Sequence, residues 1–496
     1  MGQFTLVAGG QLLDIARRRL ERAELLIEDD SIAAILPPGA AVPPDTVHID
    51  ASHRLLMPGL VNAHTHGHGH LGKGSGDTWN LELLLHHGPW LTGGRAAEDR
   101  ELACLVGGLD MIRRGITACY DLVFDPPVPS RDGLEAAAHG YARAGIRVVL
   151  APMLADRSLY QAIPGLMEAF PEPHRRTVER FSAAPHEAAM AALRAILGSW
   201  QGDRDRVRLA LAPTIPLHCS DDLLTGCRDL AREFGLRLHM HLAESRVQAV
   251  SGPVRYGASL TAHLAELGVL GPDFTAAHAI WIDADDIARL ADAGATVAHN
   301  PGSNLRLGAG IAPSRDMLDR GLALGIGTDG STCSDHQNMF EAMRMASLVS
   351  RIRSPDPARW ISAQKALELA TVGGARVLGL DGLIGRLEPG YKADIVFIDL
   401  DDPTYLPLND PVTQLVMAES GAAVNSVMVG GEFVYRDRAF PGIDLARLRD
   451  RIAERAAELT PRLAPTREVL TALESYVTAF CIGLAHGEPS AQNGSR

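Results

Sequence analysis

The sequence predicts an α/β protein built on a (β/α)8 TIM barrel, with a composite β-sandwich domain formed by its N- and C-terminal segments. Between residues 58 and 384, short apolar runs alternate with amphipathic stretches, as expected for strands and helices that follow one another. Residues 1–57 and 385–440 contain short β-like runs punctuated by turns instead. We therefore expect the two ends of the chain to fold together.

These patterns divide the 496-residue chain into four segments. Residues 1–57 are the first part of the β-sandwich, 58–384 the catalytic barrel and 385–440 the second part of the sandwich. Residues 441–496 are C-terminal helices, with helical sequence over 444–483 and a disordered tail from Gly487. The glycines Gly430 and Gly431, between two apolar runs, predict a β-hairpin over residues 424–435.

The barrel segment holds eight strand candidates, and the clearest helices lie between them. The predicted strands are Gly59–Ala63, Gly115–Leu122, Arg147–Pro152, Val207–Ala212, Arg237–Leu242, Phe274–His278, Thr296–His299 and Leu322–Thr328. The predicted helices are Ala96–Arg113, Leu134–Ala144, Glu187–Leu197, Asp222–Phe234, Leu260–Leu267, Asp285–Asp292 and Pro357–Leu369. Residues 156–186, rich in Pro and Arg, are predicted to form an insertion over the barrel rim. A doubly wound open sheet is the alternative, but it requires a Gly-rich phosphate turn after the first strand.

Composition and charge favour a small-molecule partner. The formal charge of −13 and the pI near 5.8 argue against nucleic acid or an anionic membrane as the partner. We find no apolar run near the roughly 20 residues that a membrane span needs, and no signal peptide at the N-terminus. The six cysteines show no CxxC spacing and are expected to be reduced thiols, so we expect a cytoplasmic protein.

Two histidines follow the first predicted strand. In a strand, alternate side chains point the same way, so His64 and His66 share a side, roughly 6.6 Å apart along the backbone. This spacing suits two imidazoles on one divalent ion, which binds each nitrogen at about 2.0–2.1 Å. Active sites of parallel barrels lie at the C-terminal rim of the strands, where both residues fall. Such a pair also occurs by chance, so the rest of the chain must supply further ligands.

Further candidates follow the fifth predicted strand. His239 and His241 share a face, and His241 is nearer the C-terminal end of the strand. We therefore expect His241 to be a ligand and His239 to fill a deeper layer of the barrel. Glu244 comes three residues later at the rim, where a carboxylate can accept a proton from an activated water. The alternative for Glu244 is a solvated loop acid.

Two more polar residues end later strands. His278 closes the sixth strand, where it could polarise a substrate atom or be a hydrogen-bonded core histidine. Asp329 follows the eighth strand and can complete three histidines into a set of four ligands, although Thr-Asp-Gly alone is an ordinary turn. Zinc hydrolases keep one further position open for water, whose pKa falls to about 7.

The order of these residues resembles the amidohydrolase superfamily over nearly the whole chain. HxH ends strand one, HxxE follows strand five, His ends strand six and Asp ends strand eight. The sequences at 58–66, 299–305 and 327–330 are similar to the metal-dependent deaminase branch of cytosine- and guanine-deaminase-like enzymes, s-triazine hydrolases and adenosine-analogue deaminases. Residues 385–394 resemble that branch's return into its composite β-sandwich. The resemblance implies that four residues are metal ligands: His64, His66, His241 and Asp329. It also implies that Glu244 is a proton shuttle and that His278 is an electrophilic group.

One divalent ion is expected, because binuclear relatives carry a bridging lysine on the fourth strand and this chain has none there. Three histidines and a carboxylate suit Zn²⁺, with Fe²⁺ as the alternative. His68 and His70, on a Gly-rich loop with Lys73, are expected to be exposed or to face the substrate rather than to bind a second ion. Cys333 and His336 are predicted to line the pocket. A final group forms either pocket wall or core: Trp79, His86, His87 and Trp90.

The implied function is hydrolysis of a C–N bond in a small nitrogen heterocycle, with a metal-activated water releasing ammonia. In this mechanism Asp329 and Glu244 accept protons and His278 supports developing charge. The same site would suit a cyclic amide, a urea or another leaving group, as in amidases or chlorohydrolases. A non-catalytic scaffold would have lost a ligand or the shuttle acid, and all six positions are filled. The resemblance also implies a homo-oligomer.

Overall fold

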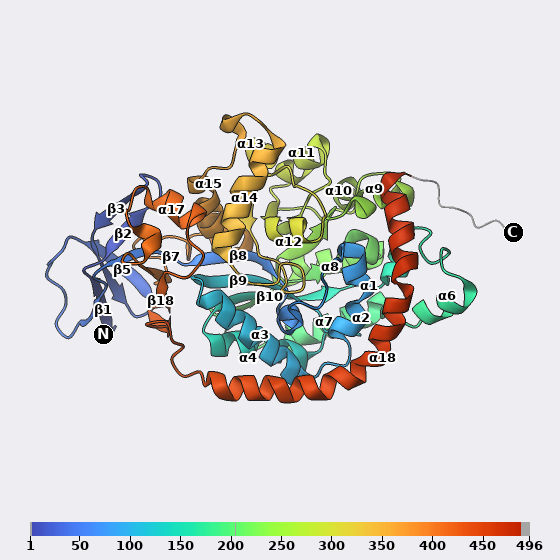
Figure 1. Cartoon of the computed structure of the whole chain (residues 1–496), viewed down its shortest axis with the longest axis horizontal. Coiled ribbons are helices and arrows are strands. Elements are labelled where there is room, and N and C mark those ends of the chain that lie inside the picture. The colour runs from blue at the N-terminus through green and yellow to red at the C-terminus, as the bar shows by residue number, and fades with distance from the viewer. Residues whose placement is uncertain (1, 204, 488–496) are drawn as a thin grey trace.

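Parallel strands form the centre of the computed structural model, which describes residues 2–203 and 205–487 (Figure 1). The strands are β8 (Leu60–Thr65), β9 (Ile116–Val123), β10 (Arg147–Leu154), β11 (Val207–Leu209), β12 (Ala212–Pro213), β13 (Leu238–Leu242), β14 (Phe274–His278), β15 (Thr296–His299) and β16 (Ala323–Ile326). One sheet has the order β11-β10-β9-β8, with β12 also paired to β10, and the second has the order β13-β14-β15-β16.

Main-chain contacts join these two sheets at both edges. Leu211 bridges to Leu238 in parallel, and its carbonyl accepts from the amide of His239 at 2.9 Å. At the other edge, the amide of Asp329 after β16 donates to the carbonyl of His64 on β8 at 2.9 Å. The carboxyl ends of the strands therefore surround one region, as in TIM-barrel-like α/β folds.

Helices follow most of these strands and pack around them (Figure 1). In the first half they are α1 (Leu81–His86), α2 (Gly88–Thr92), α3 (Ala97–Ile112), α4 (Arg131–Ala144), α5 (Leu159–Ala162), α6 (Glu172–Val178), α7 (His186–Ser199) and α8 (Asp221–Phe234). They continue as α9 (Arg246–Tyr256), α10 (Leu260–Glu266), α11 (Ala284–Asp292), α12 (Pro301–Arg306), α13 (Ser314–Asp319), α14 (Met339–Arg353), α15 (Ala363–Glu368), α16 (Gly374–Leu378) and α17 (Pro411–Met417).

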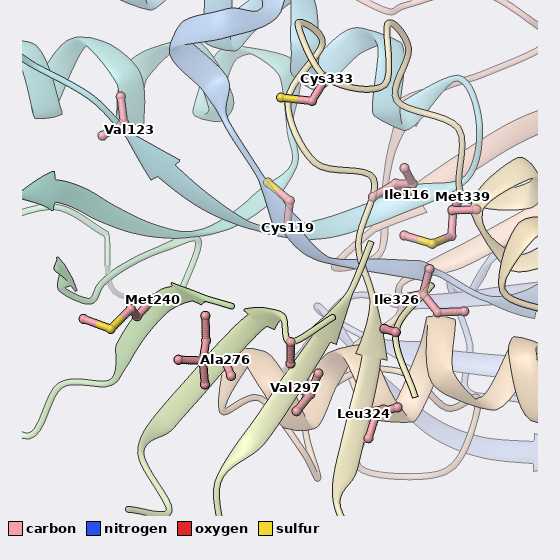
Figure 2. Close-up of a cluster of buried hydrophobic side chains, with 14 of the residues drawn as sticks. Ile116, Cys119, Val123, Met240, Ala276, Val297, Leu324, Ile326, Cys333 and Met339 are labelled. Carbon is pink, nitrogen blue, oxygen red and sulfur yellow. The ribbon is translucent and has the colours of Figure 1, made fainter. Parts of the chain in front are cut away.

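The register of β13 to β16 places apolar packing residues on one face of the sheet and His241 on the other. Met240, Ala276, Val297 and Leu324 lie side by side on β13 to β16 and belong to the largest buried apolar cluster (Figure 2). The next residue along each strand points to the opposite side. His241 is one of these, and its neighbours in register are small: Ala277, Ala298 and Gly325. The histidine therefore has space around it on the side away from the packing face.

Strands from both ends of the chain share one sheet. The N-terminal strands are β1 (Phe4–Ala8), β2 (Gln11–Asp14), β3 (Arg19–Arg22), β4 (Glu24–Glu28), β5 (Ser31–Leu36), β6 (Val47–Asp50) and β7 (Arg54–Pro58), and the C-terminal strands are β17 (Ile395–Asp399), β18 (Val424–Val429) and β19 (Glu432–Tyr435). They form a sheet of order β19-β18-β17-β7-β2-β3 and another of order β5-β4-β1-β6. An apolar cluster contains Ile27 from the second sheet and Phe397 from the first, so the two sheets share buried side chains. The hairpin β18–β19 has the bounds predicted around Gly430 and Gly431.

A buried ion pair connects the central strands to this terminal sheet. Arg147 on β10 is 5% exposed and Asp394, before β17, is 2% exposed, with Nε and Oδ2 3.1 Å apart. The amide of Gly430 also donates to Asp394 Oδ1 at 2.8 Å. Burial of charge is costly unless partners compensate for lost water, and here the two side chains and a main-chain amide do so.

The C-terminal helix α18 (Leu445–His486) confirms the predicted helical segment. Figure 1 shows two straight parts that meet at an angle, and Pro461 and Pro465 within the helix explain the bend, because each lacks the N–H of the i→i−4 bond. The second part packs on α1, α2 and α9. Its buried residues include Leu470, Leu473 and Val477.

This helix corrects one expectation from the sequence. A window of 18 residues within α18 has a mean hydropathy of 1.4, so by length and composition the helix is apolar enough to cross a membrane. One such helix is weak evidence for a span, and 22% of that window is buried inside the structure. The prediction that no run approaches this length is therefore wrong for this helix.

Other predicted elements need correction or lie outside the described residues. The helix expected over 357–369 is interrupted, because Ser362 caps a separate helix, α15, by accepting from the amide of Lys365 at 3.1 Å. The predicted fourth strand, 207–212, is divided into β11 and β12. Helices α9 and α14 were not predicted. The expected disorder of the tail falls on residues 488–496, outside the described part of the chain. All six cysteines are free and buried.

Candidate metal centre

Six side chains singled out in the sequence meet at the carboxyl ends of the central strands. Their ligand atoms form three overlapping groups, each within 4.8 Å: His64 with His241 and His278, His64 with His66 and Asp329, and Glu244 with His278 and Asp329. Every residue in these groups is buried or nearly so. The structure therefore brings together all six predicted residues.

The rings of His66 and His241 are oriented by main-chain carbonyls. Nδ1 of His66 donates to the carbonyl of Leu122 at 2.8 Å, and Nδ1 of His241 donates to that of Thr214 at 2.7 Å. Because a carbonyl only accepts, the hydrogen of each neutral ring is on Nδ1 and Nε2 keeps its lone pair. The two Nε2 atoms lie 3.2 Å apart, and a cation beside them would stabilise this arrangement.

Asp329 supplies the acidic side of the same cluster. Its Oδ1 lies 3.4 Å from Nε2 of His64 and 3.2 Å from Nε2 of His66. Burial raises the pKa of Asp329, but the two nearby histidines outweigh it and hold that pKa well below its usual value. Burial lowers the pKa of His64 to about 4, against the opposing effect of Asp329.

This donor set fits a divalent ion. Nε2 of His64 is buried and has no hydrogen-bond partner among the described residues, although buried polar atoms normally have one. It shares a small volume with two more imidazole nitrogens and a carboxylate, the ligands that zinc takes in enzymes. The residues that could hold the ion are His64, His66, His241 and Asp329.

Glu244 and His278 lie on the other side of Asp329. Glu244 is 3% exposed, so its interpretation as a solvated loop acid is wrong. Burial, assisted by the charge of Asp329, raises its pKa well above the usual value. Nε2 of His278 lies 3.7 Å from Oε1 of Glu244 and 3.7 Å from Oδ2 of Asp329. Nδ1 of His278 contacts Asn304 Oδ1 at 2.9 Å.

Left-handed backbone conformations position several of these side chains. Strand alternation alone would place His278 on the face opposite His241, because it pairs in register with Leu242. However, φ is 67° at His278 and 62° at Asp329, outside strand geometry. Non-glycine residues with such φ cost on the order of 1–3 kcal/mol and cluster at functional sites.

A cavity of about 470 Å³ opens over the cluster. His66, His241, Glu244 and Asp329 form its floor, and its volume falls in the range of small-molecule sites. Its walls come from α1, α2 and the 156–186 insertion, which therefore lies beside the site as predicted. The apolar wall residues include Leu84, Leu85, Leu91, Phe124, Tyr160 and Phe181, and the cationic ones are Arg95, Arg157 and Arg180.

The Gly-rich loop after β8 is only partly as expected. His68 lines the cavity, and its Nδ1 accepts from the amide of Phe124 at 3.1 Å. His70 is 1% exposed, so the expectation that it is exposed or faces the substrate is wrong. It lies against α3, where a Cβ atom at Gly107 would come within 1.7 Å of its ring, and it contacts Ser331 Oγ at 2.8 Å. Lys73 is exposed.

The remaining candidates are divided between pocket and support. Cys333 lines the cavity, whereas His336 pairs with Glu341 at 2.6 Å and lines a separate cavity. His86 is both wall and support, because it contacts Tyr160 Oη at 2.8 Å and donates to the carbonyl of Leu470 on α18 at 2.8 Å.

Trp79, His87 and Trp90 pack together behind this wall. The ring of His87 stacks on Trp79 with centroids 4.3 Å apart, and its Nε2 contacts Glu474 of α18 at 2.7 Å. Arg467 of α18 lies over the ring of Trp90 at 4.6 Å. These residues therefore attach the wall helices α1 and α2 to the C-terminal helix.

Sequence reasoning missed the residues that orient the site. Asn304 orients His278, and Gln248 accepts from the amide of Glu244 at 3.0 Å. His239 is fully buried, as predicted for a deeper layer, but its contact with His64 at 3.1 Å was not expected. Only the His239-Met240-His241 alternation offered a signal, because it places both rings on one face.

Comparison with known proteins defines the class. The family model of the Amidohydrolase family matches residues 55–434, and the chain belongs to this family. It is 35% identical over 441 residues to a 5-methylthioadenosine/S-adenosylhomocysteine deaminase of Nitratidesulfovibrio vulgaris strain Hildenborough, covering 87% of this chain and 91% of that protein. It is 33% identical to a 5'-deoxyadenosine deaminase of Methanothermobacter thermautotrophicus, covering 92% and 98%.

A solved structure has the same fold. It is an adenosine deaminase from Xanthomonas campestris with bound zinc, which is 25% identical with a TM-score of 0.80 and covers 93% of this chain and 98% of its own. The family predicted from the HxH, HxxE, His and Asp pattern is therefore confirmed.

Proposed function

We propose that this protein is a metal-dependent aminohydrolase that removes an amino group from a small nitrogen heterocycle. The observation that carries the proposal is the convergence of three histidines and Asp329 with the buried Glu244 on the floor of one cavity. The relatives named above act on adenosine-type compounds, so aminopurine nucleosides are the first substrates to test.

In this proposal His64, His66, His241 and Asp329 hold one divalent ion, and zinc is the ion. The zinc in the similar adenosine deaminase structure and the nitrogen-rich donor set support it, with Fe²⁺ as the alternative. A bound ion of this kind supplies a Lewis-acid centre that lowers the pKa of water toward 7.

Glu244 is the proposed proton shuttle. Burial, assisted by the charge of Asp329, raises the pKa of Glu244, which makes its carboxylate a stronger proton acceptor. It takes a proton from the attacking water and delivers one to the departing amino nitrogen. Because Gln248 holds the amide of Glu244 at 3.0 Å, the carboxyl is attached to a fixed main chain.

His278 is the proposed group that stabilises charge on the heterocycle, and Asp329 assists proton transfer. Asn304 occupies Nδ1 of His278, and Nε2, which contacts Asn300 Nδ2 at 3.3 Å, faces the two carboxylates and the proposed substrate position. Burial lowers the pKa of His278, while the charge of Asp329 opposes that effect. A proton passed to Nε2 would allow it to donate to a ring nitrogen as negative charge develops there.

The direct test is ammonia release from a panel of amino-heterocycles, measured on protein of known zinc content. We expect zinc-dependent ammonia formation and a product that retains its ring and gains one oxygen. Ring opening, detected by mass spectrometry, would favour hydrolysis of a cyclic amide or urea instead. Protein that is folded but holds no metal would favour the scaffold alternative.

The architecture proposed with this function is a closed eight-stranded barrel over residues 58–384. Residues 1–57 and 385–440 form one composite β-sandwich, and residues 441–496 form a C-terminal helical segment. The edge contacts of the central sheets and the shared six-stranded sheet support this division. We further propose a cytoplasmic homo-oligomer, for which sedimentation measurements would test the assembly.

A further inference from the structure

We infer that His239 is a positioning residue that determines which nitrogen of His64 is free to bind the ion. This inference rests on the proposed metal site. Nδ1 of His64 and Nε2 of His239 lie 3.1 Å apart, and both residues are 0% exposed. The sequence places His239 in a deeper layer of the barrel, and that position alone does not give the residue a role at the metal site.

The other two proposed imidazole ligands make the contrast. His66 and His241 each donate Nδ1–H to a main-chain carbonyl, of Leu122 and Thr214 respectively. A carbonyl oxygen can only accept, so the hydrogen of each ring has one possible place. Metal-binding histidines are usually oriented through such a bond at the second nitrogen. Of the three histidines, only His64 has another imidazole, that of His239, as the partner of its Nδ1. An imidazole nitrogen can either donate or accept.

One hydrogen lies between the two rings, and its position decides the chemistry of His64. If it is on His64 Nδ1, then Nε2 keeps its lone pair and can bind the ion. If it is on His239 Nε2, then the neutral His64 carries its hydrogen on Nε2, directed toward Asp329 at 3.4 Å, and cannot bind. Metal binding at His64 therefore requires His239 to accept.

Once Nε2 accepts, the hydrogen of His239 is on Nδ1. That atom is buried and has no hydrogen-bond partner among residues 2–203 and 205–487. The ring of Tyr120 stands at 85° to that of His239, with centroids 4.4 Å apart. An aromatic face accepts weakly from N–H, and no carboxylate or carbonyl of the described residues bonds to Nδ1 of His239.

Two amide variants of His239 distinguish a role as hydrogen-bond acceptor for His64 from a role in packing alone. His239→Gln extends an amide oxygen to the place of Nε2, whereas His239→Asn has the same chemistry but reaches only the place of Nδ1. We would measure the zinc dissociation constant by competition with a chelator of known affinity, and record visible spectra of the cobalt-substituted proteins. We expect His239→Asn to bind zinc about 10–100-fold more weakly, with altered cobalt bands. His239→Gln should recover most of the affinity and the parent spectrum.

A buried histidine outside the site provides the matched control. His263 on α10 is 8% exposed and contacts Asp221 at 2.9 Å. His263→Asn should lower the unfolding temperature and leave the zinc dissociation constant unchanged. Should His239→Asn fail to fold, the Gln variant and a Tyr120→Phe variant, both expected to retain parent affinity and spectrum, still test the inference.

Equal affinity in His239→Asn and the parent would overturn the inference, as would equal loss in the Asn and Gln variants or loss in Tyr120→Phe. These outcomes leave the proposed function intact, because the parent still binds zinc. A parent protein that binds no zinc would overturn the proposed metal site and the role of His239 with it.

Discussion

Nε2 of His66 and Nε2 of His241 lie 3.2 Å apart, while Nδ1 of each ring donates to a main-chain carbonyl. The two lone pairs are therefore directed at one another by the fold itself. The chain has organised the proposed nitrogen ligands in advance, so an ion bound to them would remove an electrostatic cost as well as form new bonds.

Removal of the ion should therefore destabilise the protein. A ligand that binds only the folded state at 100 times its dissociation constant adds about 2.7 kcal/mol to the free energy of unfolding. Urea unfolding of chelator-treated protein, with and without zinc at that excess, measures this difference. Magnesium, which prefers oxygen ligands, is the control and should add little. A zinc-independent unfolding curve would exclude a folded-state site.

Glu244→Gln should separate metal binding from turnover. The variant keeps the size of the side chain and its bond to Gln248 through the main chain, but its amide can neither accept nor release the transferred proton. We expect turnover to fall about 10²–10⁴-fold, with zinc content unchanged. Glu341→Gln is the matched control, because Glu341 pairs with His336 outside the main cavity, and it should retain parent turnover. Parent rates in Glu244→Gln would show that another group transfers the proton.

The ion pair of Arg147 and Asp394 should be much more important than those on the surface. Arg147→Met leaves a buried carboxylate without its partner, and we expect a loss of about 3–5 kcal/mol in the free energy of unfolding. Adding Asp394→Leu should recover part of that loss. Arg194→Met breaks a pair whose side chains are 59% and 49% exposed and should reduce stability far less, because water already solvates both charges. Similar losses in the two single variants, measured by urea unfolding, would contradict this expectation.

Acid should destabilise the protein through His70. Burial lowers the pKa of this residue from 6.5 to about 3, so the unfolded chain binds the proton more readily between these values. The contribution of His70 to the free energy of unfolding is therefore fully present above pH 6.5. It decreases as the pH falls, by about 2 kcal/mol between pH 7 and pH 5.

Replacement of His70 tests this sign. His70→Gln can keep a bond to Ser331 without titrating, so its stability should fall less between pH 7 and pH 5 than that of the parent. His139, whose side chain is 63% exposed, provides the control. His139→Gln should show the pH dependence of the parent. An unchanged slope in His70→Gln would mean that other groups account for the acid sensitivity.

The parts predicted well from sequence are those where one local pattern decides the outcome. Strands β14 and β15 have the predicted bounds, because each is a short apolar run closed by a histidine. Helix α14 was missed because serines interrupt its buried face. Ser347 and Ser350 are buried there through bonds to the main chain of Ile361, a partner that lies outside the helix.

At the site, too, local sequence patterns predicted some features and missed those that depend on contacts with distant segments. His64, His66, His241 and Asp329 follow strands in a recognisable order, so their convergence was predictable from the motif. The burial of His70 depends on Gly107, which is on a different helix. The contact between His239 and His64 likewise depends on the spacing of β8 and β13, which belong to different sheets. The pattern of apolar and polar residues within one segment does not predict such contacts between distant segments.

The pairing of β7 with β17 has a consequence during synthesis. Pro58 pairs with Ile395, so 337 residues (395 − 58) must be added before this ladder can begin to form. At about 5–20 residues per second, the ribosome needs roughly 17–67 s for that length. During this interval one edge of β7 has no native partner, and the nascent chain must protect that edge until nearly four-fifths of the protein has been made.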